Sequence, residues 1–198
     1  MVNFKACIVL EIVSTVLITV AAFIPGWFVI IYTKAPYRVY MNLFYGLSCS
    51  DSNSSCVLAT YLEIYKFAQR PSSDVFWLIE FQVEVVLSII LSVVTVLLLL
   101  IYRRGNKSPR FLVASIFLCI ISGSLILIGC GRILTSTLQT NQKLDTMGAD
   151  HFYSFPFSLG PAGVGGVLQI IAAVLIYLYR KEVLKGDETD SIVFFRPA

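Results

Sequence analysis

Four stretches of the chain are predominantly apolar, and most polar residues lie in the connections between them. A helix needs about 20 consecutive apolar residues to cross the hydrocarbon core of a bilayer, and each stretch has close to that length. The pattern therefore predicts an α-helical membrane protein with four spanning helices. Their expected bounds are residues 6–24, 76–102, 111–131 and 157–179.

Composition supports lipid as the solvent of the chain. Hydrophobic residues make up 57% of the 198 positions, and charged residues make up only 14%. A soluble domain of this length could not bury so large an apolar share. The first span follows a lysine, as a signal peptide would, but it is longer than a usual signal-peptide core and lacks a clear cleavage site. We therefore expect it to be retained as a membrane anchor.

Basic residues predict how the chain is oriented. An even number of spans places both termini on one side of the membrane. The connection 103–110 carries four cations and no anion, and cations also flank the first and last spans on the same side. Because cytosolic connections are enriched in Lys and Arg, we expect both termini and the tail 180–198 in the cytosol. Residues 27–75 and 132–156 then form two outer loops of a multi-pass plasma-membrane protein.

The first outer loop contains two cysteines in the longest polar stretch of the chain. Cys49 and Cys56 lie on the predicted outer side, where an oxidising environment permits a disulfide. Closing so short a ring stabilises a fold by roughly 2.5 kcal/mol in the chain-entropy description. Between the two cysteines, Asn53 begins an Asn-Ser-Ser glycosylation sequon. The three other cysteines lie inside spans, where we expect small buried hydrophobic side chains.

The same loop is predicted to be a small folded sheet. Pro25-Gly26 is a strong helix-breaking pair and ends the first helix. The residues that follow, as far as Met41, are rich in the aromatic and β-branched types that favour extended strand. The segments on either side of the cysteine pair predict a hairpin across the bridge. The spacing of residues 61–69 predicts one short helix before Pro71.

Two acids and one cation are expected at the same depth, near the outer edge of the lipid. At 1.5 Å per helical residue from the inner ends of their spans, Glu84 and Glu80 lie about 27 and 33 Å out, and Arg132 about 32 Å out. An unpaired charge at this depth is costly, so we expect Arg132 to pair with Glu80 or Glu84. The favoured interpretation is a lock between two helices, and the alternative is a site for an ion or a partner.

One further acid, Glu11, lies within the first span. We expect its carboxylate to extend toward the basic inner surface or to bond a neighbouring hydroxyl, in preference to binding a ligand. Small residues are frequent in the third and fourth spans, where they let the backbones of neighbouring helices approach closely. We expect packing within the chain to use them, in preference to a dimer face.

Catalytic and metal-binding patterns are missing from the sequence. His151 is the only histidine, which excludes a histidine-rich metal cluster, and it stands beside Asp150 in an expected solvated pair. The signatures of nucleophilic hydrolases, phosphate loops and CxxC sites are also missing. We therefore expect no enzyme activity, no cofactor and no metal. We expect the chain to contact the lipid bilayer and not to bind nucleic acid.

The arrangement resembles the claudin superfamily, which includes peripheral myelin protein, the epithelial membrane proteins and channel gamma subunits. Its members carry a Trp just after the first span and a Gly-Leu-Trp followed by two cysteines in the first outer loop. Here Pro25 and Trp27 match the first element, and Gly46 and Leu47 before the cysteine pair match part of the second. Ser48 stands in place of the second Trp, and the terminal PDZ ligand of many claudins is missing.

The resemblance implies a left-handed four-helix bundle topped by an antiparallel sheet. It also implies that the sheet associates with copies in the same membrane or in an opposing one, at junctions that form a barrier or a paracellular path. Charged residues on the sheet would line such a path. The candidates are Lys34, Arg38, Asp51, Glu63, Lys66, Arg70 and Asp74.

Two other functions, an accessory subunit and a small transporter, are alternatives to a junctional role. The first is an accessory subunit that modulates the gating or trafficking of an ion channel or receptor. The missing second Trp, the sequon and the missing PDZ ligand favour it. The second is a small transporter that uses the Glu80, Glu84 and Arg132 cluster. It is disfavoured because the sequence shows no broken-helix repeats of the kind that transporters use.

Overall fold

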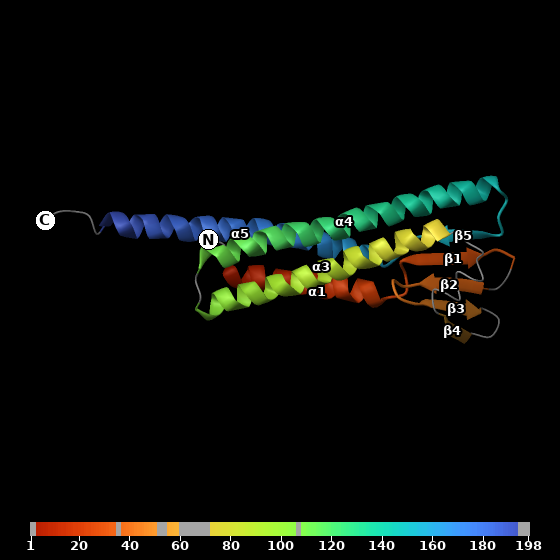
Figure 1. Ribbon diagram of the computed structural model, residues 1–198, viewed down its shortest axis with the longest axis horizontal. Helices are drawn as coiled ribbons and strands as arrows, with labels where there is room; N and C mark the ends of the chain where they lie inside the picture. Colours follow the sequence, from red (N-terminus) through yellow and green to blue (C-terminus); the bar gives the residue numbers. More distant parts are fainter. Residues whose placement is uncertain (1–2, 35–36, 51–54, 60–71, 106–107, 194–198) are drawn as a thin grey trace.

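A four-helix bundle carries a small β-sheet at one end in the computed structural model of the chain (Figure 1). The structure describes residues 3–34, 37–50, 55–59, 72–105 and 108–193. The helices are α1 (Phe4–Phe23), α3 (Ser72–Arg104), α4 (Pro109–Thr146) and α5 (Leu159–Val193). All four contain a segment long and apolar enough to cross a membrane, so the chain is a multi-pass membrane protein. The fold class predicted from the sequence is confirmed.

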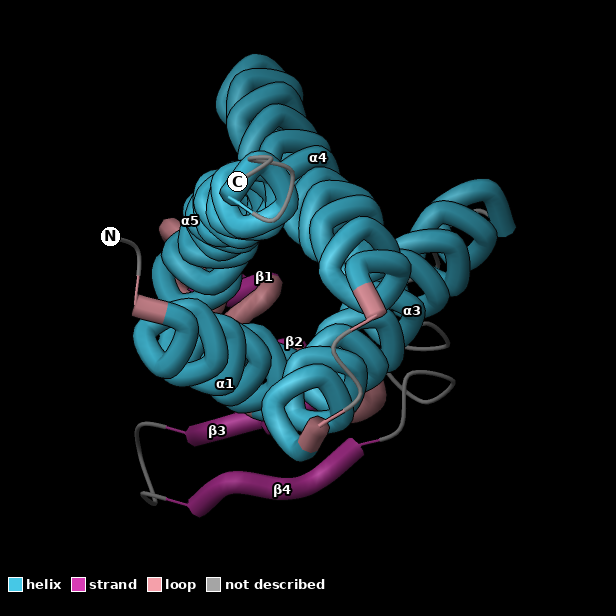
Figure 2. Tube along the Cα trace, turned by 90° about the vertical axis from the view of Figure 1, so that its left-hand side faces the viewer, coloured by secondary structure: helices cyan, strands magenta, loops and turns pink. Residues whose placement is uncertain are grey.

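The helices are arranged as a ring in the order α1, α5, α4 and α3 (Figure 2). α1 begins, and α5 ends, at the end of the bundle opposite the sheet (Figure 1). The two arginines in the last turn of α3 lie at that end as well. Large apolar side chains point outward on every helix, as expected for a surface that faces lipid. Examples with more than half of their surface exposed are Val9, Ile90, Phe117 and Val174.

The third helix is longer than its apolar stretch. The sequence predicts a span over 111–131 and an outer loop over 132–156, whereas α4 continues through Thr146. No Gly or Pro occurs between Arg132 and Thr146, so nothing breaks the helix where the apolar stretch ends. Gly148, with a φ of 64°, provides the left-handed conformation that follows the helix end.

The sheet has five strands in the order β4-β3-β2-β1-β5, and every pairing is antiparallel. Four strands come from the first connection: β1 (Phe28–Tyr32), β2 (Tyr37–Met41), β3 (Gly46–Ser50) and β4 (Ser55–Ala59). The predicted sheet and its hairpin are confirmed, although the extended stretch up to Met41 consists of two strands. The fifth strand, β5 (His151–Ser154), comes from the second connection and was not predicted. The short helix predicted at 61–69 lies outside the described residues.

Small residues determine how closely the helices pack. A Cβ atom placed on Gly123 of α4 would lie 2.9 Å from the backbone oxygen of Gly166 on α5. A Cβ atom placed on Gly165 would lie 2.6 Å from the side chain of Ile18 on α1 and 3.2 Å from the backbone oxygen of Ser14. The expected use of small residues for packing within the chain is confirmed at these positions.

The substitution Gly165→Ala should therefore destabilise the bundle by roughly 1–3 kcal/mol, the usual cost of overpacking. Gly163→Ala on the same helix is the matched control, because a Cβ atom there meets nothing within 4 Å. The control should be neutral or slightly stabilising, since Ala favours a helix over Gly by about 1 kcal/mol. Unfolding of the purified protein by SDS in mild detergent measures both changes. Equal stability of the two variants would contradict the close α1–α5 contact.

Candidate functional site

Trp27 anchors the sheet to the bundle. Its side chain is 1% exposed, and its Nε1 donates a hydrogen bond of 2.8 Å to the backbone oxygen of Ala21, in the last turn of α1. The indole packs edge-on against Phe81 of α3, with 5.0 Å between the ring centroids. Pro25 lies in the short turn that joins α1 to β1. The first element of the loop motif is thus a structural joint between two helices and the sheet.

The second element of the motif opens β3. Gly46 and Leu47 pair with β2 on one side and with β4 on the other. The backbone N–H of Trp27 donates to the carbonyl of Met41, and Met41 is the β2 partner of Gly46. Both parts of the motif therefore meet at the base of the sheet. Ser48, at the position of the second Trp in the claudin pattern, follows in the same strand.

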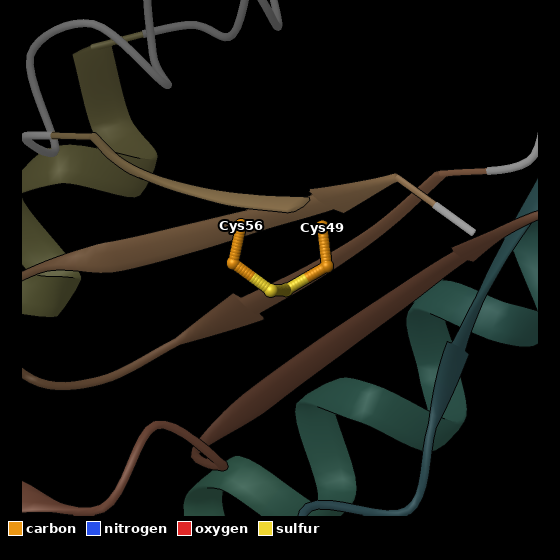
Figure 3. The surroundings of a disulfide bond; sticks show 2 residues. All are labelled: Cys49 and Cys56. Atoms are coloured by element: carbon orange, nitrogen blue, oxygen red, sulfur yellow. A yellow bond between two sulfur atoms is a disulfide. The ribbon is translucent and has the colours of Figure 1, made fainter. Parts of the chain in front are cut away.

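Cys49 and Cys56 are joined by a disulfide across β3 and β4 (Figure 3). The two residues are directly opposite each other in the strand register, with Cα atoms 4.1 Å apart. The predicted bridge is confirmed. It covalently ties the edge strand β4 to the rest of the sheet. Asn53, the sequon asparagine between the two cysteines, lies outside the described residues.

A buried amide, which the sequence analysis missed, holds the turn between β2 and β3. Asn42 has no exposed surface, and its Nδ2 donates to the backbone oxygen of Ala22 at 2.9 Å. Its Oδ1 accepts the backbone N–H of Phe44, and the hydroxyl of Tyr45 donates to the oxygen of Phe23. These carbonyls lie in the last turn of α1, where no further helical turn can bond them. The available signal was an Asn between two strand-forming segments, which is a turn pattern.

Arg132 binds both acids of the predicted charge cluster. Its guanidinium donates to Glu84 at 2.7 Å and to Glu80 at 2.8 Å, which joins α4 to α3 at the sheet end. The Glu84 side chain is 20% exposed, whereas that of Glu80 is 53% exposed. The sequence argument expected a pair with one of the two acids, and the structure shows both. Because Arg132 binds one oxygen of each acid, the geometry fits the expected lock between α3 and α4.

The charged residues of the outer loops are only partly described. Lys34 forms an ion pair with Asp150 beyond the end of β1. Asp150 therefore pairs with Lys34, and His151 instead has its ring 5.5 Å from that of Tyr32. Four of the proposed path-lining charges fall outside the described residues: Asp51, Glu63, Lys66 and Arg70.

The sheet exposes apolar side chains on its edge strand. Val57 is 65% exposed and Leu58 is 67% exposed, although both lie next to the disulfide on β4. Successive strand residues point to opposite faces, so both faces of this edge are apolar. Within the described part of the chain, β4 pairs only with β3, which leaves one row of its backbone groups at the edge of the sheet.

Polar side chains form a layer inside the bundle, which the sequence analysis also missed. The hydroxyl of Ser122 on α4 lies 2.7 Å from that of Ser88 and 2.9 Å from that of Ser92, both on α3. Gln169 of α5 donates to the Ser92 hydroxyl. All four side chains are fully buried. The available signal was the four-residue spacing of Ser88 and Ser92, which places both on one face of an otherwise apolar helix.

Glu11 belongs to the same layer. Its side chain has no exposed surface, and its Oε2 accepts a hydrogen bond of 3.5 Å from the thiol of Cys119. Of the two positions expected for this carboxylate, the extension to the inner surface is wrong; the carboxylate bonds a neighbouring side chain, which is a thiol and not the expected hydroxyl. Glu11 lies on the same face of α1 as the buried residues Ser14 and Ile18, and this face is turned toward the other helices. Cys119 is likewise a hydrogen-bond donor and not only a small hydrophobic side chain.

Comparison with known proteins identifies no family. No protein-family model matches the chain, and no curated protein matches it. The function is therefore inferred from the fold and from the residues described above.

Reversing one charge of the cluster should destabilise the protein, and reversing two should restore it. Glu84→Arg or Arg132→Glu alone places like charges together, so each should cost more than the ~0.2–1 kcal/mol of an exposed ion pair. The double variant places opposite charges together again and should recover most of the loss. The melting temperature in detergent measures the change. Glu80→Gln is the control with the smaller expected effect, and no recovery in the double variant would contradict the lock.

Proposed function

We propose that this chain is a claudin-like protein of the plasma membrane whose sheet mediates lateral or cell–cell association at junctions. Such association would form a barrier or a paracellular path. The observation that supports this most directly is the disulfide-tied sheet of five strands, fixed to the bundle by Trp27 and Asn42. A surface held in this way is preorganised, so little conformational entropy is lost when it binds.

Two features support a sheet outside the cell and both termini in the cytosol. The disulfide requires an oxidising compartment, which the outer side provides. Arg103 and Arg104 lie at the end of the bundle opposite the sheet, as the enrichment of basic residues on the cytosolic side requires.

The edge strand β4 is the proposed contact surface. Exposed edge strands pair with strands of other molecules through their backbone groups, and exposed apolar side chains add burial to that pairing. Val57 and Leu58 provide such side chains on both faces of the edge. A second copy, in the same or an opposing membrane, is the proposed partner.

The alternative function is an accessory subunit of a channel or receptor. Gly160 and Gly163 of α5 are the specific observation in its favour. A Cβ atom on either would meet nothing within 4 Å, so no other helix among the described residues packs closely against these two glycines. A spanning helix of a partner could approach α5 closely at this point.

Expression in cells that lack adhesion distinguishes the two functions. The wild type should concentrate at cell contacts and co-purify with a differently tagged copy in mild detergent. Val57→Lys combined with Leu58→Lys should abolish both effects, because lysines block edge-to-edge pairing. Met147→Lys is the matched control, since Met147 is 76% exposed at the end of α4 and not on the sheet. Stoichiometric recovery of a channel or receptor without enrichment at contacts would contradict the junctional function and support the alternative.

A further inference from the structure

Glu11 and Gln169 lie at the same level of the bundle. The hydroxyl of Ser14 on α1 donates to the backbone oxygen of Gly165 on α5 at 2.7 Å, which sets the register of these antiparallel helices. From this contact, Glu11 is three residues farther from the sheet and Gln169 is four, or about 4.5 and 6 Å along the axes. The two buried side chains therefore differ by only about 1.5 Å in depth along the bundle.

Two acceptor oxygens at this level have no hydrogen-bond donor. Oε1 of Glu11 and Oε1 of Gln169 are both fully buried, and neither has a partner. An ionised carboxylate and an amide oxygen can only accept, so they cannot satisfy each other. One N–H of the Gln169 amide bonds Ser92, and the thiol of Cys119 bonds the other oxygen of Glu11.

Glu11 also has no counter-charge. It forms no ion pair with any residue that the structure describes. The buried titratable groups in the adjoining core are the thiols of Cys7 and Cys119 and the hydroxyl of Tyr102, and none of them is a cation. α3 and α5 present uncharged side chains, Ser92 and Gln169. Rotating the Gln169 amide would give Glu11 a donor but would leave a negative charge uncompensated inside the membrane, which is costly.

We propose that the interior of the bundle is a binding site for one proton, carried on Oε1 of Glu11 and donated to Oε1 of Gln169. The proton removes the charge and supplies the donor that both oxygens lack. It completes a hydrogen-bonded layer that runs from Cys119 through Glu11 and Gln169 to Ser92 and Ser122. The layer joins all four helices, so the proton stabilises the contacts among them. This site is independent of the proposed junctional function.

The direction of the pH dependence follows from this placement. The folded protein retains a proton that Glu11 gives up to water when the chain unfolds, so stability falls as the pH rises through the range where only the folded state is protonated. In that range the unfolding equilibrium constant should increase by up to tenfold per pH unit. Glu11→Gln should abolish this dependence, because its amide N–H replaces the O–H without a titratable proton.

Infrared spectroscopy of the purified full-length protein in detergent at neutral pH tests the site directly. The wild type should show the carbonyl band of a protonated carboxylic acid, which Glu11→Gln should remove. Glu80→Gln is the control and should leave the band unchanged, because Glu80 is ion-paired with Arg132. Gln169→Leu should keep the band but shift its frequency, since the acid then loses its acceptor.

Three outcomes would overturn the proposal. The first is that the wild type lacks the band at neutral pH. The second is that Gln169→Leu leaves the frequency unchanged. The third is that replacing choline chloride by sodium chloride removes the band, which would show that the site holds a metal cation in place of the proton.

Discussion

Lipid removes the usual drive to bury apolar side chains, so the four helices must be held together by other contacts. Their outer surfaces are already apolar, so replacing a contact with lipid by a contact with another helix gains little free energy. The structure meets this constraint in two ways. Glycines such as Gly123 and Gly165 let backbones approach, and the hydroxyls of Ser88, Ser92 and Ser122 bond across α3 and α4. The bundle is therefore apolar on its outside and contains a layer of buried polar side chains in its middle.

The sheet depends on the same bundle for its position. Three side chains from the first connection, Trp27, Asn42 and Tyr45, donate to backbone oxygens in the last turn of α1. A helix that ends at the membrane surface leaves such oxygens without partners. Here the end of the helix becomes the attachment point of the sheet. The disulfide then secures the edge strand β4.

Much of this architecture could be predicted from the sequence, for identifiable reasons. Spans follow from apolar length alone, and the disulfide follows from two cysteines in one short loop. A pairing of Arg132 with Glu80 or Glu84 could be predicted from depth, because a charge near lipid needs a partner, but its binding to both acids could not. Asn42 and the interior serines could not be predicted in the same way. Their roles depend on which helices face each other, and the residue pattern of a single helix does not contain that information.

The same reasoning explains the error at Glu11 and the missed strand β5. Counting along α1 gives the depth of Glu11 but not the direction in which its side chain points. β5 is only four residues long, and β1 and Asn141 provide the backbone partners that so short a segment lacks by itself. Tertiary context therefore decided both cases.

The long third helix has a mechanical consequence. The side-chain amide of Asn141 on α4 forms two hydrogen bonds with the backbone of Tyr153. Its Nδ2 donates to the carbonyl oxygen at 2.6 Å, and its Oδ1 accepts the N–H at 2.8 Å. The last strand of the sheet is thereby fastened to a helix that also crosses the bilayer. A helix that passes through a thicker or thinner membrane changes its tilt to match the hydrocarbon thickness. Such a change in α4 would turn the edge strand β5 with it, so the surface of the sheet would respond to the thickness of the surrounding lipid.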